Sequence, residues 1–282
     1  MTRSRFINAL PEGDRGEAAL IGIPFDGFSP LRSGANSAPD AIRNGSASIE
    51  TFSAFLDRDL AGRDYVDWGN IDFQSVATAD VLSTIEKKID SITAAGMDVV
   101  ALGGEHCQTI AIVKSLLKDY PDLCVLQLDA HLNFQDVEDG EALCHATVMR
   151  RVAELIAPER IHRLGVRSGS KDEFQSAGVK LPLDIDSQYR DVEGIVMSIP
   201  RNAHLFVSLD MDVFDPSLVP GVLNPVPWGL TWREFIQVAR ALTYFKCVGF
   251  EVVELIPGID STGVSSVVAA SAVRELMLSL MP

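Results

Sequence analysis

The chain contains the stretch Cys124-Val125-Leu126-Gln127-Leu128-Asp129-Ala130-His131-Leu132-Asn133, a mainly apolar run that ends in acidic, imidazole and amide side chains. The run from Cys124 to Leu128 has the length and composition of a buried strand. Amphipathic stretches typical of helices precede and follow it, at Gln108–Leu117 and Ala146–Leu155. Because a strand between two helices is the repeating unit of a parallel sheet, this stretch predicts an α/β fold.

The same alternation continues along the chain. Further strands are expected at Ala18–Ile23, Val99–Leu102, Ile161–Val166, Leu205–Leu209 and Val248–Val253. Further helices are expected at Pro39–Phe52, Thr78–Ala95, Thr231–Leu242 and Ser265–Leu280, and the third of these begins with a capping-box sequence. No linker, repeat or change of composition interrupts this order, so we expect one domain spanning residues 1–282 with a mainly parallel sheet.

Polar motifs stand at the ends of three predicted strands. Besides Asp129-Ala130-His131, they are Gly103-Gly104-Glu105-His106 and Ser208-Leu209-Asp210-Met211-Asp212. In an open parallel sheet, ligands bind beyond the carboxyl ends of the strands. Since buried carboxylates need compensating charge, two divalent metal ions would satisfy these side chains. The candidate metal ligands are His106, Asp129, His131, Asp210 and Asp212.

These residue types indicate the metal and the chemistry. Carboxylate and imidazole ligands suit Mn²⁺ better than they suit thiolate-preferring metals, although Zn²⁺, Co²⁺ and Fe²⁺ are not excluded. Asp129 and Asp210 stand first in their motifs, and each could bridge two ions through its two oxygens. Two ions about 3.5 Å apart can lower the pKa of a shared water and direct hydroxide at an electrophilic carbon. The predicted reaction class is hydrolysis.

The charge of the chain indicates which kinds of ligand or partner it can bind. The formal net charge is −15 and the isoelectric point is about 4.7. An acidic surface argues against binding to nucleic acid or to an anionic membrane, and it favours small cationic ligands. No apolar run reaches the length of a membrane span, and the first residues lack the apolar core of a secretory signal. A cytoplasmic location is therefore expected.

Three loops are expected near the site. The Gly- and Pro-rich segment Asp26–Pro39 has the length of a loop that covers a site. Pro220–Pro225 is expected to line the site, with Asn224 as a candidate substrate-binding residue. The loop Gln135–Cys144 carries Asp136, Glu138, Asp139 and Glu141, which would attract an amine and repel a carboxylate. The alternative for this last loop is a solvated acidic segment without a role in binding.

The motifs resemble those of the ureohydrolase superfamily of arginases and agmatinases. Gly103–His106 resembles its Gly-Gly-(Asp/Glu)-His motif, and Asp129–His131 resembles its Asp-Ala-His-x-Asp motif. Ser208–Pro216 resembles its Ser-x-Asp-x-Asp-x-x-Asp-Pro motif, and Glu254–Pro257 resembles its Glu-x-x-Pro. The segment from His145 to Arg151 is most similar to the agmatinase-like prokaryotic branch.

The resemblance implies an arginase-like three-layer α/β/α sandwich that hydrolyses a guanidino group to urea and an amine through a metal-bridging hydroxide. It implies one Mn²⁺ on His106, Asp129, Asp210 and the residue at position 133, and a second on Asp129, His131, Asp210 and Asp212. Glu254 would bind the guanidinium and His145 would transfer protons, so that His145, Glu254 and Asp129 are the candidate catalytic residues. A homo-oligomer, trimeric or hexameric, is also implied.

Two departures from the family pattern replace an acid with an amide. Asn133 stands where the family has a metal-binding aspartate, and Asn70 stands where Asp-x-Gly-Asp is usual. The amide oxygen of Asn133 could still coordinate, but it brings no charge and accepts no proton at neutral pH. The first metal site is therefore expected to be weak or empty. The alternative function is a catalytically weak or silent ureohydrolase-fold subunit with a binding or regulatory role.

Overall fold

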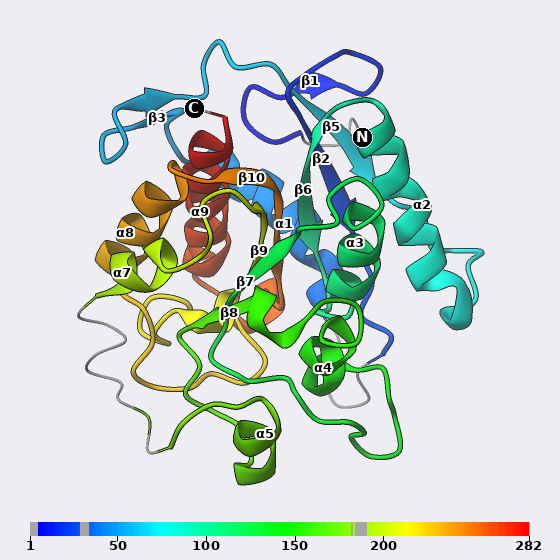
Figure 1. Cartoon of the computed structure of the whole chain (residues 1–282). Coiled ribbons are helices and arrows are strands. Elements are labelled where there is room, and N and C mark those ends of the chain that lie inside the picture. Colours follow the sequence, from blue (N-terminus) through cyan, green and yellow to red (C-terminus); the bar gives the residue numbers. More distant parts are fainter. Residues whose placement is uncertain (1–4, 29–33, 182, 184–190, 282) are drawn as a thin grey trace.

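The computed structural model describes residues 5–28, 34–181, 183 and 191–281 (Figure 1). Within these residues an eight-stranded sheet forms the centre of the molecule, and its neighbouring strands run parallel. In spatial order the strands are β1 (Leu10–Pro11), β5 (Tyr65–Asn70), β2 (Ala18–Ile23), β6 (Asp98–Gly103), β10 (Lys246–Val253), β9 (His204–Asp210), β7 (Cys124–Leu128) and β8 (Ile161–Leu164). A separate two-stranded antiparallel ribbon joins β3 (Phe52–Ser53) to β4 (Arg58–Asp59).

Helices pack on both faces of the sheet (Figure 1). One layer contains α2 (Val81–Ala94), α3 (Gln108–Leu116) and α4 (Val148–Val152). The other layer contains α1 (Ala38–Ser46), α7 (Val192–Met197), α8 (Trp232–Leu242) and α9 (Val264–Leu280). A short helix, α5 (Lys171–Ser176), follows β8. Across the described part of the chain, no helix combines the length and the apolar composition that crossing a bilayer requires.

The central strands of the sheet contribute to two hydrophobic cores. In β2, Leu20 packs into the core beneath α8 and α9, whereas Ala19 and Ile21 pack into the core beneath α2 and α3. In β6, Val100 packs into the core beneath α8 and α9, and Val99 packs into the core beneath α2 and α3. This alternation follows from the two-residue period of a strand whose two faces are both covered. The predicted three-layer α/β/α sandwich with a mainly parallel sheet is confirmed.

All the predicted strands are present, and β8 ends at Leu164, two residues before the predicted Val166. Two predicted helices are shorter than expected. The helix expected to reach Phe52 ends at Ser46, within an Asn-Gly-Ser sequence of weak helix formers, and residue 52 instead begins β3. The helix expected from Ala146 to Leu155 is α4 preceded by a 3₁₀ turn. The capping box of α8 is confirmed, because the Glu234 carboxylate accepts a hydrogen bond from the Thr231 amide.

Part of the predicted loop Asp26–Pro39 lies outside the described residues, since positions 29–33 are not among them. Its end is helical, with a 3₁₀ turn at Ala35–Ser37 that leads into α1 at Ala38. The prediction of a loop there is therefore wrong for residues 35–38, whereas Pro39 is helical as the predicted helix from Pro39 requires. Pro39 lies in the first turn of α1, where its missing N–H removes no intrahelical bond.

A buried ion pair joins α1 to β5, a strand that sequence reasoning did not predict. Arg43 donates to both carboxylate oxygens of Asp67, with N···O distances of 2.8 Å. The Arg43 and Asp67 side chains are 2% and 0% exposed. Arg43 also donates to Asn70 Oδ1. Asp67 can thus be buried in β5 because a cation from α1 reaches it.

We predict that Asp67→Asn lowers the free energy of unfolding by about 3 to 5 kcal/mol, because it leaves the Arg43 guanidinium buried without its counter-ion. Asp40→Asn is the matched control. Asp40 lies 3.6 Å from the same guanidinium, but its side chain is 65% exposed, and its loss should cost less than about 1 kcal/mol. Urea denaturation measures both values. Equal losses for the two variants would show that the buried pair has no special part in stability.

Candidate metal centre

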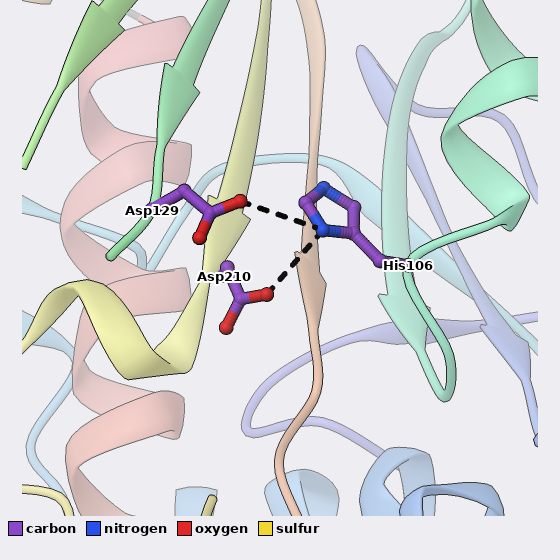
Figure 2. A group of neighbouring side chains, drawn as sticks. All are labelled: His106, Asp129 and Asp210. Carbon is purple, nitrogen blue, oxygen red and sulfur yellow. Dashed lines mark ion pairs between the residues drawn. The ribbon is translucent and has the colours of Figure 1, made fainter. Parts of the chain in front are cut away.

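The polar motifs meet at the carboxyl ends of four adjacent strands. His106 follows β6, Asp129 follows β7, Asp210 ends β9 and Glu254 follows β10. These strands lie side by side in the order β6, β10, β9, β7, so their ends share one edge of the sheet. Figure 2 shows His106, Asp129 and Asp210 pointing toward one another at this edge. The predicted convergence of these side chains is therefore present.

The first group of candidate ligands consists of His106, Asp129 and Asp210. His106 Nδ1 lies 3.6 Å from Asp129 Oδ2 and 3.3 Å from Asp210 Oδ2 (Figure 2). All three residues are buried, and one ligand atom from each lies within 4.8 Å of the others. This spacing of nitrogen and oxygen atoms suits a single ion between them.

The second group consists of Asp129, His131 and Asp212, and it also has its ligand atoms within 4.8 Å of one another. His131 Nδ1 lies 2.7 Å from Asp212 Oδ2 and 3.9 Å from Asp129 Oδ1. Asp129 therefore presents one oxygen to His106 and the other to His131. Asp210 belongs to the first group alone by this measure, although its Oδ1 accepts a hydrogen bond from the Asp212 amide.

Without a cation, the charges of this centre are poorly compensated. Burial, together with repulsion from Asp212, raises the pKa of Asp129 and of Asp210 well above the usual range. Burial disfavours the charged form of Asp212 as well, but the hydrogen bond and charge of His131 outweigh it and lower the pKa of Asp212. Burial likewise opposes protonation of His131, yet Asp212 and Asp129 raise its pKa to about 9. Burial lowers the pKa of His106 to about 3, so its ring is neutral and offers a lone pair.

The donor set fits a divalent metal. A neutral imidazole and two buried carboxylates face one another in the first group, an arrangement that is unfavourable unless a cation lies between them. Imidazole and carboxylate are the ligands that Mn²⁺ and related ions accept. The shared carboxylate of Asp129 would allow two such ions to lie next to each other.

Asn133 lies beside the first group, as the sequence predicts for its position. Its Nδ2 donates to Asp129 Oδ2 at 2.8 Å and lies 3.2 Å from His106 Nδ1. Its backbone is left-handed, with φ of 51°, a conformation that asparagine tolerates. The amide group thus faces the ligands with its N–H donors. Coordination through Oδ1 would require the amide to rotate by about 180°.

The remaining predicted residues, His145, Asn224 and Glu254, line one narrow cavity together with several of the candidate ligands. Its volume is about 10 Å³, and we call it the metal cavity. Its lining residues are His131, Asn133, His145, Asp210, Asp212, Leu223, Asn224 and Glu254. Glu254 accepts a hydrogen bond from the His106 amide at 2.7 Å. Burial, with the nearby charge of Glu105, raises the pKa of Glu254 to about 8. A cationic group in the cavity would offset that cost.

The chain is similar to known proteins both in sequence and in structure. The family model "Arginase family" matches residues 16–279. The chain belongs to the arginase family. The agmatinase of Bacillus subtilis is 33% identical over 97% of this chain and 95% of its own length. The agmatine ureohydrolase of Thermoplasma volcanium has a TM-score of 0.83 and 30% identity, covering 94% of this chain and 90% of that one.

A second similar structure is the proclavaminate amidino hydrolase of Streptomyces clavuligerus, with a TM-score of 0.89, 26% identity and coverage of 98% of this chain and 96% of that one. The predicted resemblance to the arginase and agmatinase superfamily is confirmed. The individual roles predicted for the site residues remain predictions.

In this member of the arginase family, sequence reasoning missed Glu251, which lies in β10 and is fully buried. Its carboxylate accepts hydrogen bonds from Gln108 Nε2 at 2.9 Å, from Ser208 Oγ at 2.8 Å and from the Thr109 hydroxyl. Burial raises the pKa of Glu251 to about 7, and these donors limit the rise. An acid inside an otherwise apolar strand was a signal that could have identified it.

Glu251 acts on the candidate ligand His106 through Ser208. Ser208 Oγ lies 3.0 Å from His106 Nε2. When Glu251 is ionised, it accepts the single proton of the Ser208 hydroxyl, so Ser208 can only accept at the imidazole. The Nε2 atom then carries the ring proton, and Nδ1 presents its lone pair to Asp129 and Asp210.

We predict that Glu251→Gln lowers Mn²⁺ affinity by about tenfold to a hundredfold, because Ser208 would be free to donate to His106 and place the ring proton on Nδ1. Glu275→Gln is the matched control. Glu275 is a fully buried acid in α9 that contacts Ser53 and Arg274. Isothermal titration with Mn²⁺ measures the affinity of each folded variant. Wild-type affinity in Glu251→Gln would refute the proposed orientation of His106.

Proposed function

We propose that this chain is a manganese-dependent amidinohydrolase of agmatinase type, which hydrolyses the guanidino group of a small cationic substrate to urea and an amine. The observation that carries the proposal is a narrow cavity lined by Glu254 and by His131, Asp210 and Asp212, which belong to the two groups of candidate ligands. Membership of the arginase family and the names of its agmatinase relatives support the same activity.

In this proposal the metal ligands are His106, Asp129, His131, Asn133, Asp210 and Asp212. Bound Mn²⁺ ions would supply a nucleophilic hydroxide at neutral pH. The protein positions the reacting carbon through Glu254, whose carboxylate lines the metal cavity and pairs with the guanidinium. Asn224 lines the same cavity and offers an amide to the substrate. Asp129 holds both halves of the centre through its two oxygens.

His145 is the proposed proton carrier. It lies on the wall of the metal cavity, and its Nδ1 is buried without a hydrogen-bond partner among the described residues. Burial lowers the pKa of His145, although Glu138 acts in the opposite direction. A neutral imidazole at pH 7 can accept a proton from the attacking water and donate it to the amine that leaves when the C–N bond breaks.

Asn133 favours a second candidate, a weak or silent ureohydrolase-fold subunit. Its N–H donor occupies Asp129 Oδ2, an oxygen that the first metal would need. The amide also adds no negative charge to that site. A subunit of this kind would keep the family fold and bind metal at Asp129, His131 and Asp212 without efficient turnover.

We also propose a cytoplasmic homo-oligomer, trimeric or hexameric, as the resemblance to the family implies. The acidic composition of the chain and its agmatinase relatives are compatible with this assignment.

We predict that Asn133→Asp raises metal occupancy and increases urea release from agmatine at least about tenfold, equivalent to about 1.4 kcal/mol at the transition state. The restored carboxylate adds a charged ligand and a proton acceptor. Asn70→Asp is the matched control, because it restores the family's other aspartate beside Arg43 instead of beside the metal ligands. Metal content and urea release from agmatine, guanidinobutyrate and arginine are measured together. Two Mn²⁺ per chain without urea from any substrate would favour the silent subunit.

A further inference from the structure

We propose that Glu138 binds the ammonium group at the far end of a guanidino substrate, and that it thereby selects substrates with a cationic tail. This inference deepens the proposed amidinohydrolase function and rests on it. It assigns a specificity-determining residue and a place for the part of the substrate that does not react.

The place is a cavity of about 220 Å³ next to the metal cavity, which we call the side chamber. Its lining residues are His131, Leu132, Asn133, Gln135, Glu138, His145, Ala146, Ser168, Gly169, Glu173 and Asn224. Four of these also line the metal cavity, namely His131, Asn133, His145 and Asn224. Because the two cavities share these lining residues, they adjoin each other. In this inference a substrate whose guanidinium pairs with Glu254 extends its tail into the side chamber.

A tight turn fixes the position of Glu138. Its backbone exchanges two hydrogen bonds with Glu141, at 3.0 and 2.8 Å. Between them, Asp139 and Gly140 both have positive φ, 50° and 89°. This is the pattern of a type I′ turn, and Asp-Gly is among its preferred sequences. The turn therefore holds the Glu138 backbone in one place beside the chamber.

The Glu138 carboxylate has weak partners. Its Oε2 lies 3.4 Å from Cys144 Sγ, a weak donor, and 3.8 Å from His145 Nε2. The other acid of the chamber, Glu173, is satisfied by the backbone, since its oxygens accept from the Phe134 and Ser170 amides. Glu138 is thus the lining carboxylate that retains capacity for a ligand.

The charge of the side chamber discriminates between possible tails. None of the described residues that line it is lysine or arginine, whereas two are glutamates. An ammonium tail would gain a charge-assisted hydrogen bond from Glu138, and a carboxylate tail would meet only negative charge. The chamber therefore suits an amine-ended guanidine better than a guanidino acid.

Glu138 differs from Asp136, another acid of the same loop, in its exposure and its position. Asp136 pairs with Arg151 and has a side chain that is 75% exposed, compared with 28% for Glu138. Asp136 does not line the chamber. A general acidic field would act through both residues alike, whereas a binding contact would act through Glu138. Asp136→Asn is consequently a matched control in the same loop.

The test compares three substrates of similar length on the manganese-loaded full chain: agmatine with a cationic tail, butylguanidine with a neutral tail and guanidinobutyrate with an anionic tail. In Glu138→Gln, the ratio of kcat/KM for agmatine to that for butylguanidine should fall about tenfold, chiefly through KM. The ratio for guanidinobutyrate to butylguanidine should rise. Asp136→Asn should leave both ratios within about twofold of wild type.

An unchanged agmatine to butylguanidine ratio in Glu138→Gln would overturn the inference, since Glu138 would then act through His145 or the loop. If wild type releases urea from none of the three, the proposed activity fails separately. Calorimetric binding of agmatine and butylguanidine then decides the inference. A wild-type preference for agmatine that disappears in Glu138→Gln supports it, and equal binding of both ligands to wild type overturns it.

Discussion

The site is governed by the position of Asp129, a buried carboxylate whose two oxygens face two different histidines. With Asp210 and Asp212 nearby, it concentrates negative charge where the sheet and its helices exclude water. Such an arrangement is costly unless cations compensate it. The parallel sheet creates this constraint, because it brings the ends of β6, β10, β9 and β7 to one edge.

The residues around these acids orient the candidate ligands or add to the buried negative charge. Ser208 and Glu251 orient His106 so that its lone pair faces the acids. Glu254 supplies a further carboxylate, which a guanidinium could neutralise. Asn133 is the exception, because it donates a hydrogen bond to Asp129 and offers no metal-binding carboxylate. In this chain a hydrogen bond therefore satisfies part of the charge that a metal ion would otherwise satisfy.

Local sequence was sufficient to predict much of this arrangement. Asp129, Asp210 and Glu254 directly end or follow apolar strands, and a parallel sheet leaves such residues at one edge. Local sequence was insufficient to predict β5. Its Asp67 is buried because Arg43 reaches it from α1, 24 residues earlier in the chain. Local sequence was also insufficient for Glu138, one of four acids in its loop, because only the folded turn places that side chain beside the cavity. In each case the deciding contact is distant in sequence or depends on backbone geometry.

The acids at the strand ends are expected to hold a divalent metal. Anomalous diffraction at the manganese edge, on crystals equilibrated with a limiting amount of Mn²⁺, tests this expectation most directly. We expect a peak between Asp129, His131 and Asp212, filled before any peak beside His106, because Asn133 supplies no charged ligand there. Manganese bound elsewhere, with no peak at these strand ends, would show that these acids are not metal ligands.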